Sequence, residues 1–177
     1  MGAAAWITGG LHWDGLADCA DGLGGGHDRT RALEIMRDSR IGSYGVLALV
    51  FAIGLGASAL AQFDGAVPLA AALVLGVSSR LAMVLLLLAL PPARADGLGR
   101  QGAGIPASAL LPGAICALVL IAWAGLAGLA ALAACVIAAG SIGTLARRRL
   151  GGQTGDVLGA TQVCAEILGL IALAALA

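Results

Sequence analysis

The stretch from Ala107 to Ala146, ASALLPGAICALVLIAWAGLAGLAALAACVIAAGSIGTLA, contains no charged side chain. As one straight helix it would be about 60 Å long, whereas the hydrocarbon core of a bilayer is about 30 Å thick. We therefore predict two membrane-spanning helices that fold back on each other near Trp123-Ala124-Gly125. This hairpin indicates an all-α membrane protein.

The composition of the whole chain agrees with this class. The 177 residues are 60% hydrophobic, 11% charged and 3% aromatic, and the mean hydropathy is +0.98, whereas soluble domains average about 25% charged residues. Further spans are predicted at Val46 to Phe63, Ala66 to Leu90 and Val157 to Ala177. We expect a single domain over residues 1–177, a polytopic membrane helix bundle with about five spanning helices and short interfacial helices.

The basic residues support the hairpin independently. All ten are arginines, and most fall in three clusters, at residues 29–40, 94–100 and 147–149. Basic loops gather on the cytoplasmic side of a membrane. With the hairpin all three clusters lie on one side, whereas a single span would move the last cluster to the other side. We therefore expect one polar end that faces the cytoplasm.

The segment from Thr8 to Gly45 holds six of the ten acidic residues. In a predicted helix from Leu11 to Leu23, Asp14, Asp18 and Asp21 are spaced i, i+4 and i+7, which places them within roughly 60° of one another. Such carboxylates repel one another unless a cation joins them, and magnesium prefers carboxylate and water oxygens. The pattern predicts a magnesium site, although a solvated polar face would have the same spacing.

Other polar residues on the predicted polar end suit phosphoryl transfer, which needs a divalent cation and basic groups around the phosphates. Asp156, in the turn GGQTGD at residues 151–156, is a candidate fourth metal ligand. Arg37, Arg40 and Arg94 are candidate phosphate clamps.

Two charged residues fall inside predicted spans. A charge there is costly, so Arg80 should face the protein interior, a water-filled site or an anionic group. Glu166 could pair with an arginine or be neutral. Such residues also suit a membrane transporter or channel component. Against that alternative, most charges lie in loops on one side, and the sequence shows no internal symmetry.

Several separated motifs resemble those of the cobalamin synthase family, the adenosylcobinamide-GDP ribazoletransferases. They are GGLHWDGLADCADGLGG from Gly9, DRTRALEIMRDSRIGSYG from Asp28, the pair Ser79-Arg80, ARADGLG from Ala93 and GGQTGDVLGA from Gly151. The resemblance implies a multispanning bacterial inner-membrane enzyme with a cytoplasmic active face. It would join adenosylcobinamide-GDP to α-ribazole or its 5′-phosphate and release GMP, with Mg²⁺ as cofactor. The expected partners are these small molecules and the lipid bilayer, without nucleic acid.

The resemblance also implies the site residues. The family's acidic motif maps onto Asp14, Asp18 and Asp21, and with Asp156 these are the expected metal ligands. Asp21, next to the glycine loop, is the expected acceptor of the hydroxyl proton. Family members usually carry further spans ahead of the first motif, so we expect this chain to be short at its N-terminus. The expected catalytic residues are Asp14, Asp18, Asp21, Arg37, Arg40 and Arg80, and the expected substrate-binding residues are Arg94, Gly155 and Asp156.

Overall fold

The computed structural model describes residues 2–65, 67–102 and 104–176, and in this part of the chain helices form all of the regular secondary structure apart from one isolated bridge. The all-α prediction is confirmed. In chain order the elements are α1 (Gly2–Ile7), α2 (Leu11–Gly25), α3 (Arg29–Ile35), α4 (Ser43–Leu60), α5 (Val67–Ala89), α6 (Leu98–Gln101), the 3₁₀ helix η1 (Ala107–Leu110), α7 (Leu111–Leu150) and α8 (Gly155–Leu176).

Four of these helical segments are long and apolar enough to cross a membrane: α4, α5, η1 together with α7, and α8. Their boundaries lie within a few residues of the predicted spans. The shorter α2 carries the acidic motif, and α3 carries the start of the first arginine cluster. Asp28 caps α3, since its side chain accepts a hydrogen bond from the Arg31 N–H at 2.8 Å.

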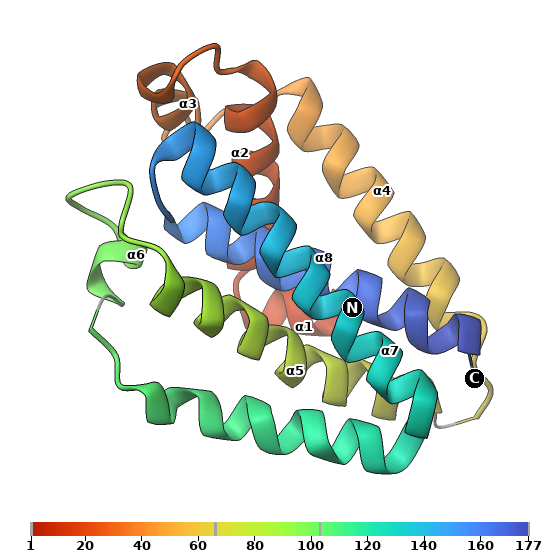
Figure 1. Cartoon of the computed structure of the whole chain (residues 1–177). Helices are drawn as coiled ribbons and strands as arrows, with labels where there is room; N and C mark the ends of the chain where they lie inside the picture. Colours follow the sequence, from red (N-terminus) through yellow and green to blue (C-terminus); the bar gives the residue numbers. More distant parts are fainter. Residues whose placement is uncertain (1, 66, 103, 177) are drawn as a thin grey trace.

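The predicted reversal of the long apolar stretch is confirmed, because α7 changes direction at Gly125. This residue has φ 54° and ψ −124°, a backbone conformation that essentially only glycine adopts without strain. In Figure 1 the arm before Gly125 runs along the bottom of the molecule, and the arm after it climbs toward α3. Counting the two arms of α7 separately gives five apolar helical segments.

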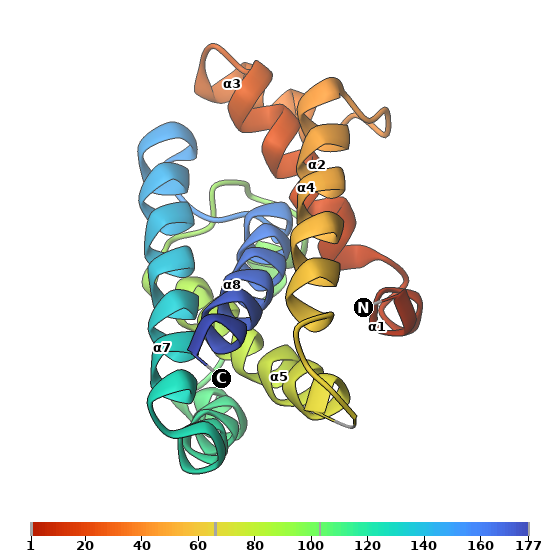
Figure 2. The same cartoon turned by 90° about the vertical axis from the view of Figure 1, so that its right-hand side faces the viewer.

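The last helix, α8, is the centre of the bundle. Of the most apolar 18 residues of α8, 67% are buried, whereas the corresponding share is 22 to 39% in the other helices that could span a membrane. It packs against α2, α4, α5 and α7, and Figure 2 shows it between α7 and α4. Glycines let α2 approach it closely: a Cβ atom on Gly15 would lie 3.0 Å from the backbone oxygen of Asp156. The start of α8 is thereby fixed beside the acidic face of α2.

The outward faces of the bundle are apolar. On α4, for example, Val50 and Phe51 are 60% and 65% exposed. Contiguous exposed apolar surface is rare on soluble monomers, whereas lipid tails would cover it in a membrane. The burial pattern therefore agrees with the composition in assigning this chain to a bilayer.

The bend at Gly125 generates a stability prediction. Gly125→Ala should lower the free energy of unfolding by about 1–3 kcal/mol, because alanine is strained at this positive φ. Thermal unfolding in detergent measures the change. The matched control is Gly140→Ala, on the second arm of α7, where an added Cβ meets nothing within 4 Å. This control should be neutral or slightly stabilising. Equal unfolding midpoints for the two variants would contradict a strained bend.

Candidate active site

The three arginine clusters meet at one end of the molecule, as the charge distribution predicted. Arg29 of α3 connects them, because its Nε donates to the carbonyl oxygen of Leu150 at 2.7 Å and its Nη2 to that of Ala93 at 2.9 Å. Leu150 ends α7, and Ala93 lies in the loop after α5. Figure 1 shows α3 beside the end of α7. Residues far apart in sequence therefore form a single polar end.

Asp14 of α2 lies at the edge of two hollows on this end. The first, here called the acid cleft, has a volume of about 160 Å³, and Asp14 lines it together with Arg94, Gly155 and Asp156. The second, here called the trough, lies between α2 and the segment that follows α3, has a volume of about 670 Å³, and is also lined by Asp18 and Arg37. The acidic motif and the GGQTGD turn are thus brought to one site.

The N-terminus of α8 opens into the acid cleft. Thr154 caps the helix, since its Oγ1 accepts a hydrogen bond from the Val157 N–H at 3.2 Å and donates one to Asp156 Oδ2 at 3.2 Å. Arg94 Nη1 lies 3.4 Å from the same Asp156 oxygen. The N-terminal end of a helix carries partial positive charge and favours anions. The cleft therefore presents both carboxylates and groups that attract phosphate.

Gln153 fixes the two loops that form the cleft, a role that the sequence analysis missed. Its backbone N–H donates to Pro91 O at 2.9 Å, and its backbone oxygen accepts from Ala93 N–H at 2.7 Å. Its side chain is 1% exposed and donates through Nε2 to Gly99 O at 2.9 Å. The only signal in the sequence was a long polar side chain between the glycines of GGQTGD.

Asp18 has a pKa that is raised well above the ordinary value of an aspartate. Burial, and then the negative charges of Asp14, Asp156 and Asp21, raise its pKa to about 6, while Arg94 acts in the opposite direction. The repulsion shows that these carboxylates are close enough to interact. Asp18 therefore exchanges its proton near neutral pH, where a general base is most effective.

Asp21 occupies a different position from the other two members of the motif. It is 8% exposed, its Oδ2 accepts a hydrogen bond from Gly42 N–H at 2.7 Å, and its Oδ1 accepts one from Gly45 N–H at 2.9 Å. Both amides belong to the first turn of α4. Asp21 thus caps a neighbouring helix, and it is not among the residues that line the acid cleft or the trough.

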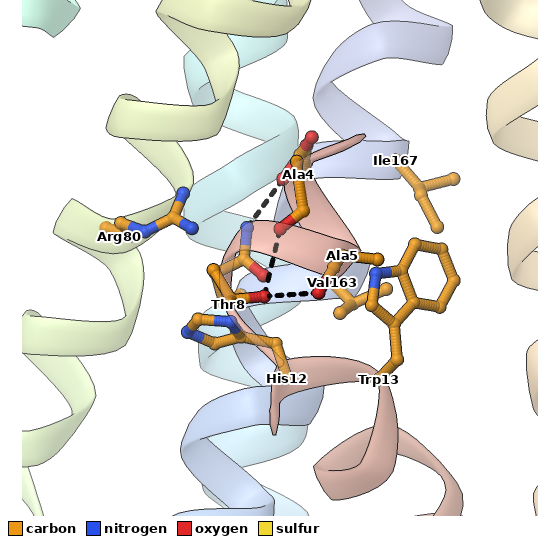
Figure 3. A pocket seen from close by; sticks show the side chains of 10 residues that line it. Ala4, Ala5, Thr8, His12, Trp13, Arg80, Val163 and Ile167 are labelled. Atoms are coloured by element: carbon orange, nitrogen blue, oxygen red, sulfur yellow. Dashed lines mark hydrogen bonds between the residues drawn. The ribbon is translucent and has the colours of Figure 1, made fainter. Parts of the chain in front are cut away.

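Arg80 lines a separate, partly open pocket of about 20 Å³, together with His12, Gln162 and Glu166. Figure 3 shows Arg80 pointing toward it from α5, across from Thr8 and His12. Arg80 Nη1 donates to Gly76 O of its own helix. Arg80 does not line the cleft that holds Asp14 and Asp156.

The remaining predicted clamps lie on the surface of the polar end. Arg37 Nη2 lies 2.7 Å from Asp96 Oδ1. Arg40 Nη2 lies 2.7 Å from Asp38 Oδ2, and its side chain is 86% exposed. Hydrogen bonds from Arg40 lower the pKa of Asp38 to about 2. Arg37 lines the trough, whereas Arg40 is held against Asp38 at the surface.

The fit of a magnesium ion can be tested on these carboxylates. Among residues 2–65, 67–102 and 104–176, no three His, Cys, Asp or Glu side chains form a ready-made metal cluster. Magnesium nevertheless usually keeps several waters and takes only one or two protein carboxylates. Asp14 and Asp156 line one cleft and fit that requirement, and Asp18 is close enough for its charge to interact with theirs, whereas both oxygens of Asp21 accept hydrogen bonds from amides at the start of α4.

The cap on α4 generates a stability prediction. Asp21→Ala should lower the free energy of unfolding by about 1–3 kcal/mol, because it leaves two largely buried N–H groups without an acceptor. Thermal unfolding in detergent measures the loss. Glu34→Ala is the control, since it removes an acidic side chain from an exposed i, i+3 pair with Arg31, and it should change stability little. A fully stable but inactive Asp21→Ala protein would favour a chemical role instead.

The raised pKa of Asp18 generates a pH prediction. Because its folded pKa of about 6 exceeds the ordinary value of 3.8, the neutral form stabilises the fold below pH 3.8. That contribution is lost as the pH rises through 6. Asp18→Asn should match the wild type in unfolding midpoint near pH 4 and exceed it above pH 7. Midpoints measured across this range check the result, and a constant difference between the two proteins would refute it. Asp64→Asn, at the exposed turn after α4, is the control.

Comparisons with known proteins agree with the motifs. The family model described as cobalamin-5-phosphate synthase matches residues 1–174. The adenosylcobinamide-GDP ribazoletransferase of Sinorhizobium medicae is 48% identical over 98% of this chain and 71% of its own length. Those of Rhizobium meliloti and Azorhizobium caulinodans are each 47% identical, over 96% and 93% of this chain and 70% and 66% of their own lengths.

No solved structure matches the chain significantly. The family match covers nearly every residue, including the acidic motif on α2 and the GGQTGD turn that together line the acid cleft. The chain therefore belongs to the cobalamin-5-phosphate synthase family, whose named relatives are transferases of cobalamin biosynthesis.

Proposed function

We propose that this chain joins adenosylcobinamide-GDP to α-ribazole or its 5′-phosphate and releases GMP. The relatives' name gives adenosylcobinamide-GDP as a substrate and ribazole transfer as the type of reaction. The observation that supports the same reaction in this chain is the acid cleft, where Asp14 and Asp156 lie beside Arg94 and the N-terminus of α8. A diphosphate needs a cation bound by carboxylates, together with basic groups and amide dipoles around its oxygens.

In the proposed reaction the ribose hydroxyl oxygen of α-ribazole attacks the phosphorus that is attached to cobinamide. A new O–P bond forms, the bond from this phosphorus to the bridging oxygen breaks, and GMP leaves with that oxygen. The hydroxyl must lose its proton as the bond forms. Asp18 suits this step because its pKa is about 6. We assign the proton to Asp18 and no longer to Asp21, whose oxygens bind the amides of α4.

Magnesium is part of the proposal. Asp14 and Asp156, which line the same cleft, would hold it beside the proton acceptor Asp18, and it would supply charge neutralisation to the diphosphate. Arg94 lies beside Asp156 and orients this carboxylate through their ion pair. Arg37 lies at the trough and is the arginine best placed to offset charge on the departing GMP. Arg40 and Arg80 remain candidates for the same task, although Arg80 lines a separate pocket.

The proposed location is the bacterial inner membrane, with the polar end in the cytoplasm. The four apolar helices support a multi-pass protein. Exposed arginines gather where α3, the end of α7 and the loop after α5 meet, and arginine-rich loops stay on the cytoplasmic side. Accessibility of a cysteine introduced near Arg148 to a membrane-impermeant thiol reagent, in cells of known orientation, would test the orientation.

The test of function is magnesium-dependent release of GMP from adenosylcobinamide-GDP in the presence of α-ribazole, with purified protein in detergent. Asp18→Asn should lower kcat by about 100-fold or more, because the proton acceptor is lost. Chelation of magnesium should abolish product formation. Asp64→Asn, which changes a carboxylate outside the site, should retain wild-type activity.

Two results would overturn the proposal. One is an Asp18→Asn protein with wild-type kcat, which would remove Asp18 from the chemistry. The other is transport of cobinamide into liposomes by the wild-type protein without any release of GMP, which would support a transporter instead.

A further inference from the structure

We propose that Asp96 is an internal substitute for a substrate phosphate: its carboxylate holds Arg37 in the empty site and is displaced when the anionic substrate binds. This inference rests on the proposed function, and it assigns to Asp96 a role in substrate affinity.

In this pair one nitrogen of the Arg37 guanidinium contacts both oxygens of the Asp96 carboxylate. Arg37 Nη2 lies 2.7 Å from Asp96 Oδ1 and 2.9 Å from Oδ2, so that both carboxylate oxygens accept from the guanidinium. Arginine binds carboxylate and phosphate oxygens in the same manner. A phosphate placed between the two residues would therefore offer Arg37 the same contacts with more charge.

The pair stands where three hollows meet. Asp96 lines the acid cleft, and Arg37 lines the trough. Both residues also line a third hollow of about 470 Å³ between α3 and the loop after α5, here called the α3 groove. Separation of the pair would open a passage from the groove to the cleft and the trough. A diphosphate with a bulky group at each end needs such a continuous passage.

The pair can be broken without releasing the loop that carries Asp96. Its side chains are 57% and 69% exposed, and exposed ion pairs contribute little to stability. The loop is held by other bonds: Arg29 to Ala93 O, Arg94 to Leu33 O, and Gln153 to Pro91 O and Gly99 O. The fold therefore does not need the Arg37–Asp96 contact, and a competing anion could replace it.

Asp96 then sets the affinity for substrate. While it holds Arg37, an incoming phosphate must compete with it and must also overcome its negative charge. If its charge is removed, Arg37 is available and the repulsion disappears. The structure thus predicts that neutralising an acidic residue in this site strengthens binding of the nucleotide.

The experiment measures the Kd of GMP by isothermal titration calorimetry on the full chain in detergent with magnesium. Asp96→Asn should bind GMP about 2- to 5-fold more tightly than the wild type, the range expected for loss of an exposed competing pair. The KM for adenosylcobinamide-GDP should fall in parallel. The unfolding midpoint should stay unchanged, because Asp96 is proposed to act on substrate binding and not on the stability of the fold.

Two controls separate the effect of the Arg37–Asp96 pair from a general effect of negative charge near the site. Glu34→Gln removes the same charge from the α3 groove, but Glu34 pairs with Arg31, so it should tighten GMP binding by a smaller factor. In an Arg37→Gln background, Asp96→Asn should lose most of its effect, because there is no guanidinium left to release. This double-mutant cycle measures the coupling directly.

The inference is overturned if Asp96→Asn binds GMP no more tightly than the wild type, or if Glu34→Gln gives the same gain. It is also overturned if the gain persists without Arg37. In each of these cases a wild-type protein that releases GMP leaves the proposed function standing. A wild-type protein that neither binds GMP nor releases it from adenosylcobinamide-GDP overturns the proposed function, and the inference with it.

Discussion

The close approach of α2 to the first turns of α8 is the constraint on which the site depends. Gly15 and Gly159 face each other across this contact, and a Cβ on Gly159 would lie 3.4 Å from the Gly15 Cα and 3.2 Å from the backbone of His12. Small residues allow such packing between membrane helices. Because α8 begins at this contact, its positive end and Asp156 come to lie beside Asp14. Larger side chains here would separate the two halves of the cleft.

The three regularly spaced aspartates of α2 lie in three different environments. Asp14 is exposed at the cleft, Asp18 is partly buried among like charges, and Asp21 is buried against the start of α4. The helix repeat places them on a similar face, but the partner of each side chain comes from a different segment. The repulsion around Asp18 is partly offset, because two backbone N–H groups donate to Asp21 and the positive charge of Arg94 lies beside Asp156.

The polar end is held together mainly by arginines that bind backbone carbonyl groups. Arg29 donates to carbonyl oxygens of Leu150 and Ala93, so it orders the loops without neutralising a carboxylate of the site. Arg94 donates to the carbonyl oxygen of Leu33 and also forms an ion pair with Asp156. Carbonyl groups at helix ends lack partners within the helix, and the bonds to Leu150 and Leu33 satisfy some of them. Arg29 therefore anchors loops, Arg37 pairs with a carboxylate and can exchange that partner for a ligand, and Arg94 combines both contacts.

The sequence by itself determined the all-α class, the spans, the reversal near Gly125 and the common end of the three arginine clusters. These features depend on the length of apolar runs and on the position of charges between them, which are local properties of the chain. The tertiary structure alone decided that Asp21 caps α4, that Arg80 lines a pocket separate from the acid cleft, and that Gln153 and Asp96 belong to the site. The partners of these side chains lie far from them in sequence, and no local periodicity encodes which donor meets which acceptor once the helices have packed.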